Sequence, residues 1–182
     1  MGNLYFVRHG QTIWNVENKI CGATDIALTE LGHEQAIETG RKILEMGIKA
    51  DEIRYSPLVR AKDTALHIAE ITGIRAVEEP RLIEQNFGKY ESTPRDGADF
   101  QAAKRQFIST YEGGESMFHL AQRIYNFLDE LKSDGRDFII VAHNGIARVV
   151  RSYFCEMTNE EYAAFGIKNC EVMTFDFDQA RN

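Results

Sequence analysis

Short apolar runs alternate with helical patterns along the chain. The runs at residues 4–7 and 138–142 are apolar throughout, which is typical of strands covered on both faces of a parallel sheet. Shorter runs predict four further strands, of which the last lies at an edge of the sheet: 53–55, 76–77, 82–83 and 172–175. Strands that alternate with helices in this way indicate an α/β protein.

Apolar residues at three- and four-residue spacing predict helices between these strands. Thr29 and Ser116 are suited to begin two of them, because a hydroxyl oxygen accepts a hydrogen bond from a free N–H of the first turn. The predicted helices cover the following ranges: 29–46, 57–71, 99–110, 116–131, 145–154 and a last one from 159. We expect a three-layer α/β/α sandwich, with helices on both faces of a mostly parallel central sheet.

The length of 182 residues fits one domain, and the chain has neither an internal repeat nor a proline-rich linker. We therefore expect a single domain over residues 1–182. Residues 85–118 are its least regular part and contain several glycines. We expect this segment to form a short cap that faces the substrate.

The net charge of −7 argues against partners that need a basic surface, so we expect neither nucleic-acid nor membrane binding. No apolar run approaches the roughly 18 residues of a membrane span, and Arg8 comes too early for a signal peptide. The three cysteines, Cys21, Cys155 and Cys170, include no C-x-x-C pair. This pattern favours a cytoplasmic location over a disulfide scaffold or a zinc ribbon.

Polar side chains stand where four of the predicted strands end. They are Arg8 with His9, Arg60 one turn after Ser56, Glu84, and His143. A lone histidine or arginine at such a place is more often structural than catalytic. In parallel α/β sheets, however, ligands bind beyond the carboxyl ends of the strands, and four polar ends at one edge favour a shared pocket.

Two arginines and two histidines at one edge indicate chemistry on an anion rather than on a metal ion. Guanidinium groups match phosphate oxygens with bidentate hydrogen bonds, and their charge keeps a nearby imidazole neutral and nucleophilic. A second imidazole can donate to the phosphoryl oxygens. The motifs H-E-x-x-H, G-x-x-x-x-G-K-[ST] and G-x-G-x-x-G are absent from the sequence, so neither a zinc hydrolase nor a nucleotide-cradling loop is indicated.

The same residues resemble a known family. Arg8-His9-Gly10-Gln11-Thr12, followed by Asn15, is similar to the R-H-G-[EQ]-T-x-x-N signature of the histidine phosphatase superfamily, also called the phosphoglycerate mutase-like family. Further matches follow in the family's order over about residues 4–150: Gly22 with Asp25, Ser56-Pro57-Leu58 with Arg60, Leu82 with Glu84, Gly114-Glu115-Ser116, and His143 with Gly145.

The resemblance implies that His9 is the nucleophile and forms a covalent phosphohistidine. It implies that Arg8, Arg60 and His143 hold the transferring phosphoryl group, and that Glu84 is the general acid and base. It implies no metal ion, because arginine and histidine charges take its place. The residues expected to bind substrate around this centre are Gln11, Asn15, Cys21, Gly22 and Asn144.

Several positions depart from the family's pattern. Asn144 stands where many members have glycine, and Tyr90 and Ser92 stand where many have tryptophan and glycine. Cys21 stands where glutamine or threonine is frequent, and we expect a small, buried thiol there rather than a reactive one. These differences concern the pocket for the leaving group.

Three functions are compatible with the sequence. The first is a phosphatase for small phosphate monoesters, and the second is a phosphoglycerate mutase, which would need 2,3-bisphosphoglycerate as a primer. The third is a non-catalytic module that binds phosphoesters. The short cap, the sequence E-Q-N-F-G at 84–88 and the lack of an Arg-Arg pair in 85–114 favour the phosphatase, because a mutase excludes water from its phosphoenzyme.

We expect a small phosphorylated metabolite as partner, no cofactor for a phosphatase, and a monomer or homodimer. The leaving group stays open among sugar phosphates, phosphoglycerates, nucleoside monophosphates, a cobalamin-pathway nucleotide and phosphoproteins.

Overall fold

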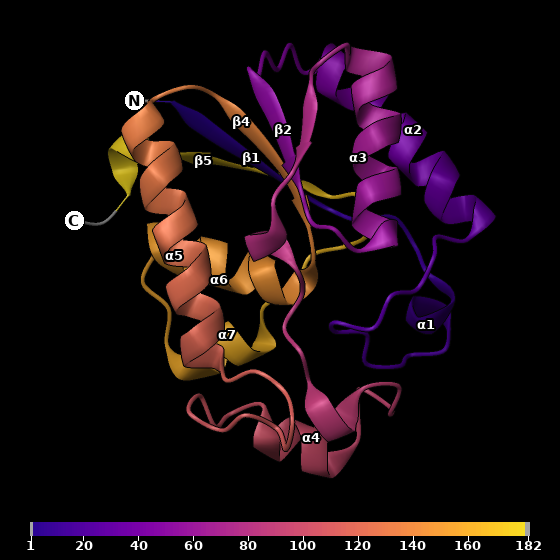
Figure 1. Cartoon of the computed structure of the whole chain (residues 1–182), viewed down its shortest axis with the longest axis vertical. Helices are drawn as coiled ribbons and strands as arrows, with labels where there is room; N and C mark the ends of the chain where they lie inside the picture. Colours follow the sequence, from indigo (N-terminus) through magenta and orange to yellow (C-terminus); the bar gives the residue numbers. More distant parts are fainter. Residues whose placement is uncertain (1, 181–182) are drawn as a thin grey trace.

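The computed structural model describes residues 2–180, so the outermost positions of the expected domain, 1 and 181–182, lie outside it. A five-stranded sheet of order β3-β2-β4-β1-β5 forms the centre (Figure 1). Four strands are mutually parallel, and β5 pairs antiparallel with β1 at one edge. The strands have these bounds: β1 Asn3–Arg8, β2 Glu52–Tyr55, β3 Ala76–Glu78, β4 Phe138–Ala142 and β5 Val172–Asp176.

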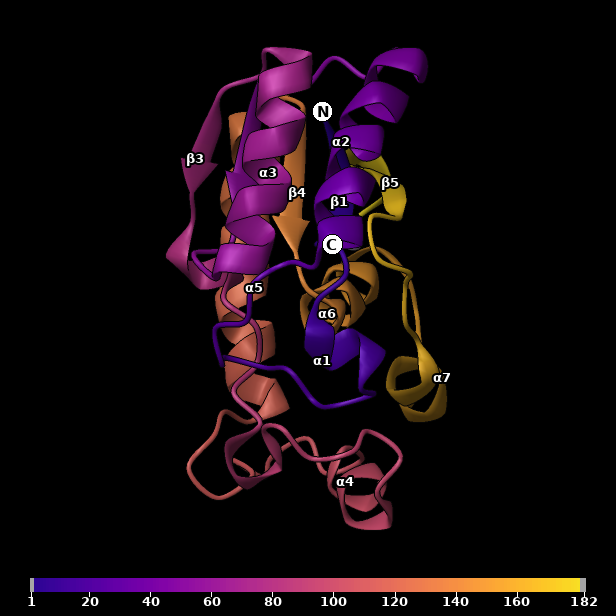
Figure 2. The same ribbon diagram turned by 90° about the vertical axis from the view of Figure 1, so that its right-hand side faces the viewer.

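Helices cover both faces of this sheet, which confirms the three-layer α/β/α arrangement. Helices α2 and α3 lie on one face, and α5 and α6 lie on the other (Figure 2). The helices have these bounds: α1 Ile13–Val16, α2 Glu30–Glu45, α3 Val59–Thr72, α4 Ala98–Ala103, α5 Met117–Asp134, α6 Asn144–Phe154 and α7 Asn159–Ala164.

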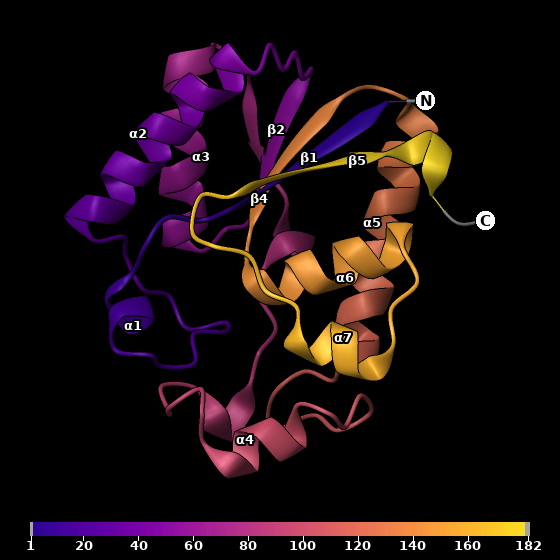
Figure 3. The same ribbon diagram turned by 180° about the vertical axis from the view of Figure 1, so that it is seen from behind.

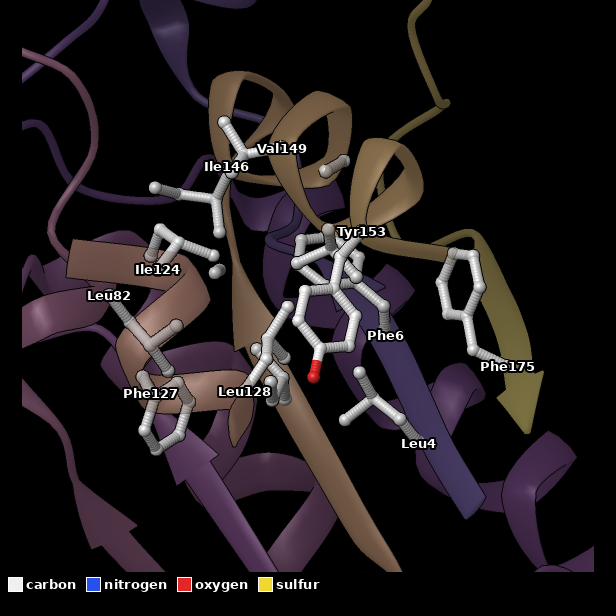
Figure 4. Packing of buried hydrophobic residues seen from close by; sticks show 14 of the residues in the cluster. Leu4, Phe6, Leu82, Ile124, Phe127, Leu128, Ile146, Val149, Tyr153 and Phe175 are labelled. Carbon is white, nitrogen blue, oxygen red and sulfur yellow. The ribbon is translucent and has the colours of Figure 1, made fainter. Parts of the chain in front are cut away.

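The central strands are apolar throughout because each of their faces packs into a core. Side chains alternate between the two faces of a strand. Phe138 and Ile140 of β4 therefore pack with α5 and α6, whereas Ile139 and Val141 pack with α2 and α3. Figure 4 shows the first of these cores, in which Leu4 and Phe6 of β1 meet the helices.

The predicted helix starts are confirmed at two positions. The Oγ1 of Thr29 accepts a hydrogen bond from the N–H of Gly32, and the Oγ of Ser116 accepts one from His119. Each cap satisfies a donor that the first turn of a helix leaves without an intrahelical partner. Among residues 2–180, no helix has the length and apolar character needed to cross a membrane.

The predicted strand at 82–83 is wrong. Residues Pro80–Leu82 form a 3₁₀ turn, in which the carboxylate of Glu79 accepts from the N–H of Arg81 and the N–H of Leu82 bonds to the carbonyl of Glu79. These local bonds turn the chain away from the sheet after β3, so Glu84 follows a turn and not a strand. The helix predicted at 99–110 is also shorter and ends at Ala103.

The cap segment, residues 85–118, lies beyond the end of the sheet toward which β4 points (Figures 1 and 2). It carries helix α4, and its residues Phe87, Phe100 and Tyr111 pack in a small cluster with Ile20 from the segment between α1 and α2. Figure 3 shows that the chain between α7 and β5 passes the carboxyl end of β1 at the back of the molecule. These two segments enclose the ends of the central strands.

The packing of α5 against the sheet predicts a large loss of stability for Leu128→Ala. Leu128 has no exposed surface, and its truncation leaves a cavity that costs about 2–5 kcal/mol in the free energy of unfolding. Leu66→Ala on α3 is the matched control, because 44% of Leu66 is exposed and its loss costs about 0.5 kcal/mol or less. Denaturant unfolding measures both values, and equal losses would contradict this core.

Candidate active site

His9 stands directly after β1 and is held in one orientation. Its backbone N–H donates to the carbonyl of Ala142 at 2.9 Å, which continues the pairing of β1 with β4 by one residue. The ring is 4% exposed, and its Nδ1 lies 2.7 Å from the carbonyl of Gly10. A carbonyl only accepts hydrogen bonds, so Nδ1 carries the proton and Nε2 keeps a free electron pair.

Bonds from two other segments hold the backbone around His9. The N–H of Gly10 donates to Thr64 of α3, and the side-chain amide of Asn169 donates to the carbonyl of His9 at 2.8 Å and to Asn15 at 3.2 Å. Asn169 lies between α7 and β5, and no sequence motif indicated it. The nucleophile predicted from sequence is thus held by residues far apart in the chain.

His143 follows β4 and lies beside His9. The two ring centroids are 5.2 Å apart, with the planes inclined by 56°. The Nε2 of His143 shares a hydrogen bond of 2.7 Å with the Oγ of Ser56, which directly follows the neighbouring strand β2. The Nδ1 of His143 is buried and has no hydrogen-bond partner among residues 2–180. If the Ser56 hydroxyl donates to Nε2, Nδ1 carries the proton of the neutral ring and can donate a hydrogen bond to an anion.

Two buried arginines complete the centre. Arg60 has no exposed surface, and its terminal nitrogens donate to the carbonyls of Thr24 at 2.8 Å and Gly22 at 2.7 Å. Arg8 donates to the carbonyl of Ile167. Within the part of the chain that is described, the Nε of each arginine lacks a partner. Buried donors without partners are rare in proteins, and an anionic ligand would satisfy them.

The charges of these arginines act on both histidines. Burial, and then the positive charges of Arg60 and Arg8, hold the pKa of His9 well below its usual value. The pKa of His143 is lowered for the same reasons, with burial and Arg60 as the largest causes. Both rings are therefore neutral at neutral pH, and the Nε2 of His9 is available for attack on an electrophile.

The side chain of Glu84 lies against the N-terminal end of α6. One of its oxygens accepts from the N–H of Gly145 at 2.8 Å, and the other accepts from the N–H of Gln85 at 2.9 Å. Only glycine fits at 145, because a Cβ there would lie 2.4 Å from the carboxylate. Burial raises the pKa of Glu84, and the two N–H donors and Arg60 oppose this effect. A carboxyl group with a raised pKa is suited to donate a proton.

These groups meet at one pocket, and about 560 Å³ of space free of atoms lies within it and at its open mouth. Arg60 and His143 do not line this pocket but lie fully buried beside it. The ring of His143 lies next to the ring of His9, and the charge of Arg60 acts on both histidines. The residues of the expected set that line the pocket are Arg8, His9, Asn15, Cys21, Glu84 and Asn144.

Two further residues of the expected set, Gln11 and Gly22, also lie outside the pocket wall. The side-chain oxygen of Gln11 accepts from Thr29 at the start of α2. Gly22 donates its N–H to Glu91 and supports Arg60 with its carbonyl. Both therefore position neighbouring groups. Burial raises the pKa of the Cys21 thiol, which keeps it protonated.

The pocket also contains cations that sequence reasoning did not assign to it. Arg95 and Lys104 reach it from the cap, and Arg148 reaches it from α6. Arg148 stands four residues after Asn144 on the same helix, so helical periodicity could have revealed it. Nothing in the irregular cap indicated the other two. Residues 2–180 contain no group of three or more His, Cys, Asp or Glu side chains placed to hold a metal ion.

The comparisons with known proteins agree with this geometry. The model of the histidine phosphatase superfamily (branch 1) matches residues 4–182, so the chain belongs to this superfamily. A protein named probable phosphoglycerate mutase GpmB from Erwinia tasmaniensis is 32% identical over 99% of this chain and 87% of its own length.

Solved structures share the fold. A mycobacterial glucosyl-3-phosphoglycerate phosphatase in complex with VO3 has a TM-score of 0.83 at 27% identity, over 100% of this chain and 96% of its own. A protein from Escherichia coli that is named as an alpha-ribazole-5'-P phosphatase has a TM-score of 0.80 at 21% identity, over 95% of this chain and 89% of its own. At this identity the similarity shows the fold alone. Relatives of this chain thus include proteins named as phosphatases and as mutases.

The bond between His143 and Ser56 predicts a defect for Ser56→Ala. Without the hydroxyl, the Nε2 of His143 is left unsatisfied and the proton on Nδ1 is no longer fixed, so kcat for an aryl phosphate falls about tenfold or more while KM changes little. Steady-state kinetics measure both constants. Ser152→Ala, which removes a hydroxyl bonded to Tyr125, is the control. A similar loss in both variants would contradict the positioning role.

Proposed function

We propose that this protein is a metal-independent phosphatase, which hydrolyses small phosphate monoesters through a phosphohistidine on His9. The observation that carries the proposal is a set of buried nitrogens without partners among the described residues: the Nε of Arg8, the Nε of Arg60 and the Nδ1 of His143. They belong to the same site as the free Nε2 of His9. A phosphoryl group bound in the pocket meets Arg8 and the nucleophile, and it lies beside the buried Arg60 and His143.

In the first step, Nε2 of His9 attacks phosphorus, so an N–P bond forms as the ester P–O bond breaks. Arg8, Arg60 and His143 stabilise the negative charge on the phosphoryl oxygens. The protonated carboxyl of Glu84 gives its proton to the leaving alkoxide, which departs as an alcohol.

In the second step, a water molecule attacks the phosphorus of the phosphohistidine. The carboxylate of Glu84 accepts a proton from this water, while the N–P bond breaks and returns its electron pair to Nε2 of His9. The products are inorganic phosphate, a neutral His9 and a protonated Glu84, so the enzyme is restored. The arginine charges supply the electrostatic stabilisation that a metal ion supplies in other phosphatases.

Phosphoglycerate mutase activity is the second candidate, because relatives at 32% identity carry that name. It would use the same phosphohistidine and return the phosphoryl group to another hydroxyl of the bound substrate. Two observations favour hydrolysis. The cap is a small cluster of side chains over a pocket that is open at its mouth, which admits water. A phosphatase is also among the structures that match the whole chain.

A metal-free panel of phosphate monoesters, with EDTA present, tests the proposal. We expect free phosphate from the wild type and loss of both turnover and phosphate labelling of the protein in His9→Ala. His119→Ala, at an exposed position of α5, is the control and keeps full activity. Isomerised 3-phosphoglycerate in the presence of 2,3-bisphosphoglycerate, without free phosphate, would identify a mutase. Metal-dependent activity that survives in His9→Ala would overturn the mechanism.

Glu84→Gln tests proton donation to the leaving group. Since an alkoxide needs a proton and an activated aryloxide does not, we expect the rate of phosphorylation to fall about 100-fold or more for an alkyl phosphate and much less for an aryl phosphate. The raised pKa of Glu84 extends its protonated range upward in pH, so alkyl ester cleavage by the wild type falls on the alkaline side as this group ionises. Single-turnover rates against pH measure both effects. Equal losses on the two substrates would remove Glu84 from this role.

A further inference from the structure

The pocket carries more positive charge than one phosphoryl group requires. Besides Arg8, it is lined by Arg95, Lys104 and Arg148, while Glu84 is its only acidic lining residue. The chain as a whole has a net charge of −7, so this concentration of cations is local. An enzyme for monoesters of neutral alcohols has no use for three cations beside the phosphoryl site.

Two of the three additional cations, Arg95 and Arg148, are held by neutral groups. The Nε of Arg95 donates to the carbonyl of Lys19 at 2.8 Å, and the Nε of Arg148 donates to the carbonyl of Phe165 at 2.7 Å. Within residues 2–180, no carboxylate lies within ion-pair distance of Arg95, Lys104 or Arg148. Their charges therefore remain available to a ligand.

The cations also act on one another. Burial, and then the charges of Arg148 and Arg95, lower the pKa of Lys104 to about 8. Burial is the largest cause of the lowered pKa values of Arg95 and Arg148 as well. Like charges brought together in a partly desolvated place are unfavourable unless an anion joins them.

We infer that the leaving group of the substrate carries a second anionic group, which Arg95, Lys104 and Arg148 bind while Arg8, Arg60 and His143 hold the phosphoryl group. Phe87 and Phe100 line the same pocket and are suited to contact a short carbon skeleton between the two anions. The second group is a carboxylate or another phosphoryl group, since both accept hydrogen bonds from guanidinium and ammonium. This inference rests on the proposed function and names the substrate class of that site.

A matched pair of substrates tests the second anion. 3-Phosphoglycerate and glycerol 3-phosphate differ by a carboxylate in place of a hydroxymethyl group, and glycerol 1,3-bisphosphate supplies a phosphoryl group instead. We expect kcat/KM of the wild type to be at least about tenfold higher for one of the charged substrates than for glycerol 3-phosphate. The better of the two charged substrates identifies the second group. Equal values for all three would overturn the inference.

Lys104→Gln and Arg95→Gln test the residues. We expect each to raise KM for the preferred charged substrate about 10- to 100-fold, and to lower kcat/KM for this substrate at least about tenfold more than kcat/KM for glycerol 3-phosphate. Arg105→Gln removes an exposed charge next to Lys104 and is the control. Lys104→Arg keeps the charge and retains the preference. A loss shared equally by charged and neutral substrates would overturn the subsite.

A binding measurement separates this inference from the proposed function. If none of the esters yields phosphate, the proposed function fails, and calorimetry with the wild type and Lys104→Gln decides the subsite independently. Tighter binding of 3-phosphoglycerate or glycerol 1,3-bisphosphate than of glycerol 3-phosphate, lost in Lys104→Gln, supports the subsite. Equal binding of all three compounds overturns it. If glycerol 3-phosphate is hydrolysed as well as the others, the proposed function stands and the inference alone fails.

Discussion

Among residues 2–180, the guanidinium of Arg60 is buried without a carboxylate partner, and the rest of the site depends on this charge. Carbonyls of Gly22 and Thr24 hold it, and its field reaches His9, His143 and Glu84. Burial is the largest cause of the low pKa values of both imidazoles, and the charge of Arg60 lowers these values further. At Glu84 the same charge opposes the effect of burial on the pKa of the carboxyl group. A buried cation without an anionic partner costs free energy, and the packing of the surrounding layers offsets this cost. A bound anion would remove it by pairing with the guanidinium.

The sheet brings this charge to the histidines. Adjacent parallel strands β2, β4 and β1 end at the same edge, and their next residues, Ser56, His143 and His9, therefore become neighbours. Ser56 and His143 bond directly, and His143 meets His9 ring to ring. The apolar side chains that fill both faces of the strands fix the register, and the register fixes the distances at the site.

The cap has a different role from the sheet. Its cluster around Phe87 and Phe100 is small and separate from the two main cores, so its sequence can change without loss of the catalytic edge. Arg95 and Lys104 enter the pocket from this segment, whereas the groups that we propose to bind the phosphoryl group come from strand ends and α3. Under the proposed function, bond cleavage takes place at the rigid layers and the choice of leaving group belongs to a loop, as is common in proteins.

The sequence by itself predicted the five strands of the sheet, the layer arrangement and the residues that we propose for the reacting centre. Apolar runs and helix caps are local properties, and His9, Glu84, Arg60 and His143 stand in motifs with fixed spacing. Only the tertiary structure decided that Gln11 and Gly22 face other groups, that Asn169 supports the nucleophile, and that Arg95 and Lys104 line the pocket. The turn at Pro80–Leu82 likewise overrode an apolar run. Side-chain direction in an irregular segment depends on contacts with residues far away in the chain. Local sequence patterns do not predict those contacts.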